Sequence, residues 1–132
     1  MTVVVDTSVI LAVVLNETTK PALIQRTVNV ELVAPASLHW EIGNALSALL
    51  KRSRITVDEA QQALVAYQTI PIRFLDVPLD AALAVAAQYG LYAYDAYMVV
   101  CAQQMAAALL TLDKGLSTAA HAAHIHCWEV IP

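Results

Sequence analysis

The sequence has 132 residues, of which 59% are hydrophobic and 14% charged, and its formal net charge is −4. This length fits one domain, spanning residues 1–132, and its two cysteines are too few for a disulfide framework, so both are expected to be reduced and buried. The longest uncharged stretch, Ala96–Leu112, is shorter than the roughly 20 residues of a membrane-spanning helix and the N-terminus has no basic signal region, so we expect a cytoplasmic protein.

The first half of the chain predicts two strands and four helices. The β-branched run at the N-terminus is typical of a buried strand, and Thr7 or Ser8 can cap the helix that follows. Thr56 with Glu59 three residues later forms a capping box. In chain order we expect a strand at Thr2–Val5, helices at about Val9–Leu15 and Pro21–Asn29, a strand at Glu31–Ala34, and helices from Ser37 to about Arg52 and from Thr56 to about Thr69.

The second half continues the alternation of strands and helices. Gly90 is a natural helix end, since glycine accepts the left-handed conformation there. In chain order we expect a strand at Ile72–Leu75, helices at Asp80–Tyr89 and about Tyr94–Ala107, a strand at Ala108–Leu112, a helix at Lys114–Ala120 and a strand at Ile125–Val130. Such alternation predicts an α/β fold with a mainly parallel, five-stranded sheet and helices on both faces.

Four acidic residues in otherwise apolar segments are expected to converge. Asp6 follows the first strand and Asp113 the fourth, and the carboxyl ends of parallel strands form the functional crevice of open α/β sheets. Asp95 begins a long helix and Glu41 lies in the first turns of another, so both start from the same edge. Each acid alone also fits a helix cap, a turn or a solvated position; Asp6 is the hardest to explain this way, because an unpaired acid after a buried strand is costly.

Carboxylates gathered in one crevice repel one another. Two unit charges about 4 Å apart cost roughly 4 kcal/mol at an effective dielectric of 20, and Lys114 is the only basic sequence neighbour of the four acids. Raised pKa values or a divalent cation relieve this repulsion. Oxygen-only ligands select hard ions such as Mg²⁺ or Mn²⁺, which activate water and stabilise displacement at phosphorus.

The segments around the four acids resemble the four motifs of PIN-domain proteins, and most closely those of VapC toxins from VapBC toxin–antitoxin systems. They are Val4-Val5-Asp6-Thr7-Ser8, Glu41-Ile42-Gly43-Asn44-Ala45-Leu46, Tyr94-Asp95-Ala96-Tyr97 and Leu110-Thr111-Leu112-Asp113. No single motif is specific, but the ordered set covers nearly the whole chain. The resemblance implies a PIN-like three-layer sandwich.

The resemblance also implies roles for individual residues. Asp6 and Asp95 would be the principal Mg²⁺ (or Mn²⁺) ligands, and Glu41 and Asp113 would complete the acidic, catalytic pocket. The implied supporting polar groups are Ser8, Asn44 and Thr111. The implied activity is that of an endoribonuclease acting on structured RNA, and the implied partners are a cognate antitoxin and a second copy of the chain. The excess of apolar residues independently predicts a buried interface.

Several features remain open at this stage. The net charge of −4 is unusual for a nucleic-acid binder. Lys51, Arg52 and Arg54 fit either contacts with RNA phosphates or the ordinary preference of cations for a helix C-terminus. His121, His124 and His126 match no zinc pattern and favour structural or solvated roles. Trp40 is expected in the core or an interface, while His39 and the tyrosines Tyr92, Tyr94 and Tyr97 are expected to pack, with contact to RNA as the alternative.

The sequence also bears on other possible functions. A phosphatase of the haloacid dehalogenase type would need a second acid two residues after Asp6, where Ser8 stands. A PIN scaffold without catalytic activity, binding a protein or RNA partner, and a stand-alone PIN nuclease without an antitoxin remain as alternatives.

Overall fold

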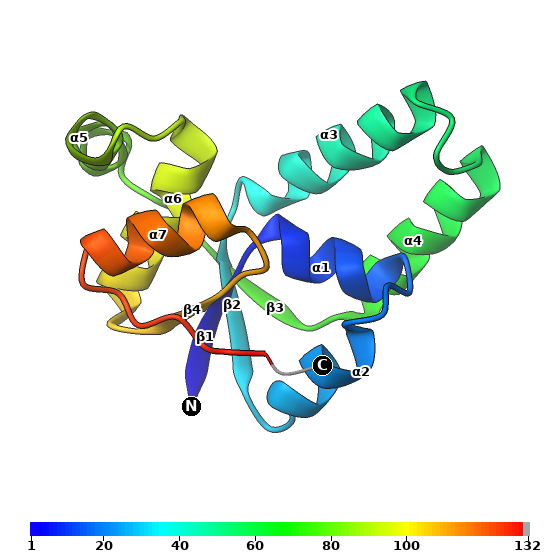
Figure 1. Cartoon of the computed structure of the whole chain (residues 1–132), viewed down its shortest axis with the longest axis horizontal. Helices are drawn as coiled ribbons and strands as arrows, with labels where there is room; N and C mark the ends of the chain where they lie inside the picture. Colours follow the sequence, from blue (N-terminus) through cyan, green and yellow to red (C-terminus); the bar gives the residue numbers. More distant parts are fainter. Residues whose placement is uncertain (131–132) are drawn as a thin grey trace.

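The computed structural model (Figure 1) describes residues 1–130 and is built on a four-stranded, fully parallel sheet. The strand order is β3-β2-β1-β4, so the first strand of the chain is central. Its three valines, Val3 to Val5, are completely buried. The strands are β1 (Thr2–Val5), β2 (Glu31–Pro35), β3 (Ile72–Leu75) and β4 (Ala108–Leu110).

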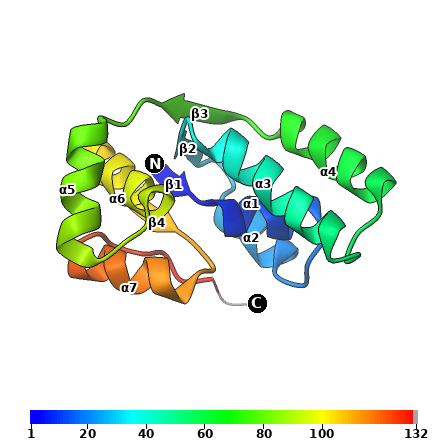
Figure 2. The ribbon, with the colours of Figure 1, turned by 90° about the horizontal axis from the view of Figure 1, so that it is seen from above.

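Helices cover both faces of the sheet, which confirms the predicted three-layer α/β architecture (Figures 1 and 2). One group of helices lies on one side and forms an arm with α3 and α4 at its far end. That group is α1 (Thr7–Val14), α2 (Lys20–Arg26), α3 (Leu38–Lys51) and α4 (Val57–Thr69). The other side carries a second arm made of α5 (Leu79–Tyr89), α6 (Ala93–Met105) and α7 (Lys114–Ala122).

The predicted fifth strand, Ile125–Val130, is reduced to one bridge. Cys127 pairs in parallel with Leu109 of β4, and the Leu109 N–H and carbonyl bond to His126 and Trp128, each at 2.9 Å. The Trp128 ring is buried, and the Arg26 guanidinium of α2 lies 3.6 Å from its centre. Because Trp128 packs toward α2, the backbone leaves the sheet after one residue.

The strand β4 ends at Leu110, two residues earlier than predicted. The backbone N–H groups that would continue the ladder bind side chains instead: Leu112 donates to Ser8 Oγ at 2.9 Å, and Asp113 donates to Thr111 Oγ1 at 3.0 Å. Side-chain hydrogen bonds therefore turn the chain away from the sheet and into α7.

Helix ends follow the predicted signals to within a few residues; α6, for example, ends at Met105 and not at the predicted Ala107. The cap of α1 is Asp6 rather than Thr7 or Ser8, because its carboxylate accepts from the Val9 N–H. The helix α2 stops at Arg26, before the predicted Asn29, which has a positive φ of 60°. The last helix, α7, runs two residues beyond the predicted end. Gly90 ends α5 in the left-handed conformation, as predicted.

The Thr56–Glu59 capping box at the start of α4 is confirmed, since each side chain accepts from the other residue's backbone N–H. We expect Thr56→Ala to lower the free energy of unfolding by about 1 kcal/mol, because it leaves one N–H of the first turn without its partner. Urea denaturation measures this change. Thr18→Ala, at an exposed threonine of the α1–α2 connection, is the control; an equal loss in both variants would contradict the assignment.

Both cysteines are free thiols. Cys101 is fully buried in α6, where burial raises its pKa to about 11, whereas Cys127 is only half-buried and so departs from the predicted full burial. Over residues 1–130, no helix combines the length and hydrophobicity that crossing a bilayer requires.

Candidate acidic site

Asp6 lies directly after the central strand and is the one charged or polar side chain that the described core buries, with 5% of its surface exposed. Its carboxylate accepts three hydrogen bonds: Ser8 Oγ and the Val9 N–H donate to Oδ1 at 2.6 and 3.2 Å, and Thr111 Oγ1 donates to Oδ2 at 2.5 Å. These bonds fix the orientation of the carboxylate but bring no positive charge to it.

The pKa of Asp6 is raised. Burial is the main cause and the negative charge of Asp113 adds to it, while the hydrogen bonds from Ser8, Thr111 and Val9 act in the opposite direction. Within residues 1–130 the only salt bridge joins Arg73 and Glu31, so no cation of the described chain compensates the buried carboxylate. A buried acid of this kind is stabilised by a proton or by a bound cation.

Glu41 projects from the first turn of α3 and is held from two sides. Thr7 Oγ1 donates to Oε1 at 3.1 Å, and Ser37 Oγ donates to Oε2 at 2.9 Å. The pKa of Glu41 is raised, mainly by burial and further by the charges of Asp6 and Asp95. Thr7 is the first residue of α1 and follows Asp6 directly, so this bond ties α3 to the edge of the sheet where Asp6 lies.

Asp95 and Asp113 belong to the second arm. Asp95, in the first turn of α6, is half-buried, and no group within residues 1–130 donates a hydrogen bond to its carboxylate. Its pKa is raised by burial and by the charges of Asp113 and Asp6. Asp113 is exposed and caps α7, accepting from Gly115 and Leu116 at 2.8 and 3.3 Å. Its capping role thus accounts for an acid at this position. Its negative charge also raises the pKa values of Asp6 and Asp95.

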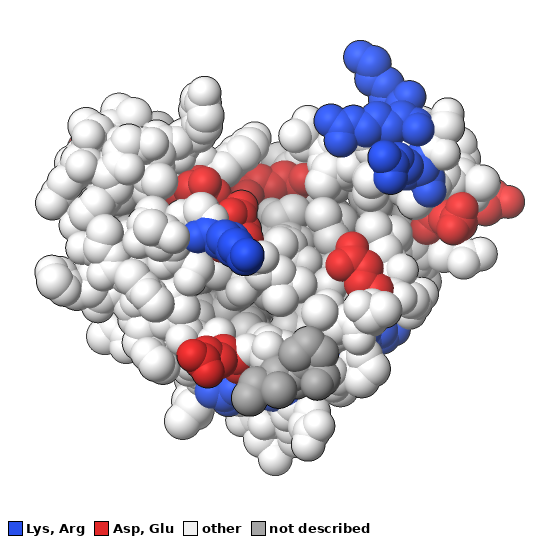
Figure 3. All heavy atoms as spheres, in the orientation of Figure 1, with Lys and Arg blue, Asp and Glu red and all other residues white. Residues whose placement is uncertain are grey.

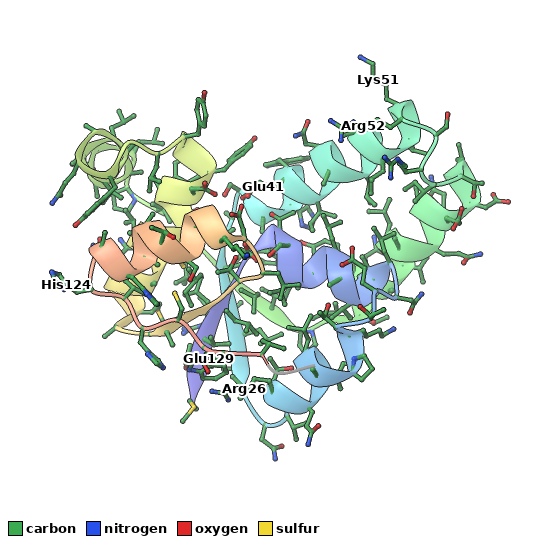
Figure 4. The ribbon with its side chains drawn as sticks, in the orientation of Figure 1. Arg26, Glu41, Lys51, Arg52, His124 and Glu129 are labelled. Atoms are coloured by element: carbon green, nitrogen blue, oxygen red, sulfur yellow. The ribbon has the colours of Figure 1, made fainter. Side chains whose placement is uncertain are left out.

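The charges of Asp6, Asp95 and Asp113 therefore act on neighbouring acids of the set, although the four acids come from separate segments. Figure 3 shows acidic side chains at the bottom of a hollow between the two arms, and Figure 4 places Glu41 there, at the start of α3. The arrangement concentrates negative charge where β1, β2 and β4 end.

The supporting polar residues divide into two groups. Ser8 and Thr111 bond to Asp6, whereas the exposed Asn44 contributes only its backbone carbonyl, to Ser47 Oγ. Thr7 and Ser37, which hold Glu41, were not predicted as part of the site. The available signals were the position of Thr7 directly after Asp6 and the spacing of four residues between Ser37 and Glu41.

Aromatic and histidine neighbours of the site have mixed roles. Trp40 is 72% exposed, so of the two predicted locations the core is wrong and an interface stays a prediction. His39 bonds to Tyr67 of α4 at 2.8 Å and packs edge-on against Phe74, which accounts for it structurally. At the start of α6, Tyr92 is 89% and Tyr94 45% exposed, and the latter contacts Tyr97 ring to ring at 6.0 Å.

The donor set fits a hydrated hard cation better than a fully enclosed one. In the part of the chain that the structure describes, no three His, Cys, Asp or Glu side chains are arranged to hold a metal ion by themselves. Mg²⁺ generally keeps several of its waters and takes one or two carboxylates. The buried, uncompensated Asp6 and the unbonded carboxylate of Asp95 are the oxygen donors with most to gain from such an ion.

The sheet and its acidic edge define a class of protein: three-layer α/β domains with a carboxylate site where the parallel strands end. The chain belongs to the PIN-domain family, whose model matches residues 3–122. PIN domains are generally nucleases and generally use divalent metals.

Two solved structures share the fold. PAE2754 from Pyrobaculum aerophilum is 25% identical, with a TM-score of 0.70 over 90% of this chain and 79% of that one. FitAcB from Neisseria gonorrhoeae has a TM-score of 0.66, covers 96% of each chain and, at 18% identity, shows similarity of fold alone. No curated protein matches the sequence.

Proposed function

We propose that this chain is a Mg²⁺- or Mn²⁺-dependent endoribonuclease that cleaves phosphodiester bonds of structured RNA. The observation that carries the proposal is the buried Asp6 carboxylate, oriented by three hydrogen bonds but compensated by no cation of residues 1–130. The chain belongs to the PIN-domain family, whose members are generally nucleases, and this supports the same function.

Each residue has a definite part in this proposal. Asp6 and Asp95 would hold the cation, and Glu41 and Asp113 would complete the catalytic pocket. The bound cation would supply an activated water and charge neutralisation at the phosphate. Ser8 and Thr111 keep Asp6 oriented.

Glu41 has a further part in the chemistry. Its raised pKa brings proton uptake at its carboxylate closer to neutral pH, which suits a group that exchanges a proton with water. Thr7 and Ser37 keep the two carboxylate oxygens in place for that exchange.

The direct test is cleavage of a mixed RNA pool. We expect fragments with Mg²⁺ or Mn²⁺ and intact RNA with excess EDTA, since phosphate cannot approach four uncompensated acids without the cation. Fragment lengths are read by denaturing gel electrophoresis. A pool that stays intact with every divalent ion tested would leave the alternative of a PIN scaffold without catalytic activity, which the capping roles of Asp6 and Asp113 favour.

We further propose that the chain is the toxin component of a type II toxin–antitoxin system. The likeness of its four motifs to VapC toxins supports this. Induced expression is expected to stop bacterial growth, and co-expression of the antitoxin from the same operon is expected to restore it. Unimpaired growth together with RNA cleavage would identify a stand-alone nuclease instead.

A homodimer is the third part of the proposal. The support is the exposed face of α5, where Leu79 and Leu83 are 63% and 64% exposed and stand four residues apart on one side of the helix. Sedimentation equilibrium of the wild type and of Leu83→Glu tests it, with a dimer expected for the first and a monomer for the second.

A further inference from the structure

Three basic side chains crowd the far end of the arm formed by α3 and α4. Lys51, Arg52 and Arg54 are all exposed, and we call them the basic tip. They are three of the seven lysines and arginines of the chain. Figure 3 shows them as the largest basic cluster on the face that also contains the acidic hollow, and Figure 4 labels Lys51 and Arg52 at the end of the helix that begins near Glu41.

Three of the four remaining cations have partners elsewhere, and the fourth, the exposed Lys114, stands alone within residues 1–130, at the start of α7. Arg73 pairs with Glu31 at 2.8 Å, Arg26 stacks on Trp128 at 3.6 Å, and Lys20 donates to Asn16 Oδ1 at 2.7 Å. The basic tip forms no salt bridge with any residue from 1 to 130. Its charges are thus available to an anionic partner.

The backbone of the basic tip is well fixed. Ser53 adopts a left-handed conformation (φ 54°), and the N–H groups of Ser53 and Arg54 donate to the carbonyls of Leu50 and Leu49 at 3.0 and 2.9 Å. This is the Schellman ending of a helix. The capping box of α4 begins two residues later, so the turn is constrained on both sides and less conformational entropy is lost when a ligand binds.

The part of α3 that leads from Glu41 to the basic tip carries no acidic residue. No aspartate or glutamate occurs in the sequence between Glu41 and Asp58. Ala45 and Ala48 follow Glu41 at helical spacing, which leaves a track of small side chains along α3. Ten residues of helix separate Glu41 from Lys51, or about 15 Å at 1.5 Å per residue.

We propose that the basic tip binds the phosphate backbone of the RNA substrate at a distance from the cleaved bond. The inference rests on the proposed nuclease function and adds a requirement on substrate length. At roughly 3.4 Å per stacked nucleotide, about 15 Å corresponds to four or five nucleotides. An RNA that extends this far along α3 reaches both sites, and a shorter one reaches only the acids. In this arrangement the basic tip attracts the RNA at a distance from the acidic crevice. This explains how a chain of net charge −4 holds a polyanion.

The test compares the triple variant Lys51→Gln/Arg52→Gln/Arg54→Gln with the wild type. The control is Lys20→Gln/Arg73→Gln, which removes cations outside the basic tip. Fluorescence anisotropy with a labelled RNA of about 20 nucleotides, without divalent cations, gives affinity at several salt concentrations. We expect the triple variant to bind about tenfold or more weakly, with a salt-dependence slope lower by about 2, since each single-strand phosphate contact contributes about 0.7.

Cleavage assays with Mg²⁺ supply the second readout. For the long RNA, we expect kcat/KM of the triple variant to fall mainly through a higher KM. For an RNA of about two nucleotides, which is too short to span the distance to the basic tip, we expect wild-type values. Normal cleavage of the short RNA also shows that the variant is folded. If the triple variant does not fold, the three single variants replace it, each expected to lower the salt slope by about 0.7.

The outcomes separate this proposal from the proposed function. Equal affinity and KM in wild type and triple variant, with cleavage intact, would overturn the role of the basic tip alone and leave its cations as helix-terminus stabilisers or a site for an acidic protein. A wild type that neither binds nor cuts RNA would overturn the nuclease function itself, and the basic tip proposal with it.

Discussion

Replacing Asp6 with asparagine is expected to abolish RNA cleavage while leaving the fold intact. Loss of groups that merely orient metal ligands typically costs 10–100-fold, so loss of a proposed ligand should reduce kcat/KM at least about 100-fold. Asparagine matches the shape of the buried carboxylate and still accepts from the Val9 N–H that begins α1. The rate of cleavage of a fixed RNA with saturating Mg²⁺ measures the effect.

Asp58→Asn provides the matched control for this substitution. Asp58 is an exposed acid in the first turn of α4, away from the crevice, so its replacement removes the same charge without touching the site. We expect cleavage within twofold of wild type, as for most surface substitutions. A residual rate in Asp6→Asn equal to that of Asp58→Asn would show that the buried carboxylate has only its capping role.

The second large effect concerns stability as a function of pH and Mg²⁺. The pKa values of Asp6, Glu41 and Asp95 are all raised in the folded chain, chiefly by burial. These carboxyls therefore hold protons more tightly when folded than when unfolded. Their contribution to stability is fully present below the ordinary carboxyl pKa of about 4 and is lost as pH rises through the raised values. Without divalent ions, the melting temperature should therefore fall as the pH rises above about 4.

Mg²⁺ is expected to reverse this loss at the higher pH. An ion that binds only the folded chain stabilises it by about 2.7 kcal/mol at a concentration 100 times its dissociation constant. Protons compete for the same oxygens, so the rise in melting temperature should be larger at about pH 8 than at about pH 5. Scanning calorimetry at constant ionic strength measures both, and Asp6→Asn should lose most of the Mg²⁺ effect. An equal response at both pH values would place the ion elsewhere.

Local sequence signals predicted most of the fold. Strand β1, the capping box at Thr56 and the glycine end of α5 each depend on a few neighbouring residues, and each appears as expected. The prediction of a full fifth strand was wrong because the path of this segment depends on a contact with a residue distant in the sequence. The apolar run Ile125–Val130 looks like a strand, but stacking of Trp128 under Arg26, about one hundred positions away in the chain, directs it to α2.

The candidate site was predicted in outline but not in detail. Strand ends and helix starts indicate one edge of the sheet, where burial and neighbouring acids raise the pKa values of Asp6, Glu41 and Asp95. The partners of Glu41 were missed because Thr7 lies 34 residues away in the chain and a hydroxyl carries no pattern of its own. The role of Asn44, in contrast, was implied only by the resemblance to the PIN-domain motifs, and its side chain makes no hydrogen bond within residues 1–130.

The single bridge at Cys127 has a consequence for how copies of this chain can associate. It occupies the outer side of β4, where Leu109 is already bonded to His126 and Trp128. The opposite margin, β3, is only four residues long and carries Arg73. Short, charged or covered margins oppose strand addition and fibril-like stacking. Within residues 1–130, neither edge strand of the sheet is therefore long and open enough for strand-by-strand polymerisation. We expect copies of this apolar chain to associate through their helices instead.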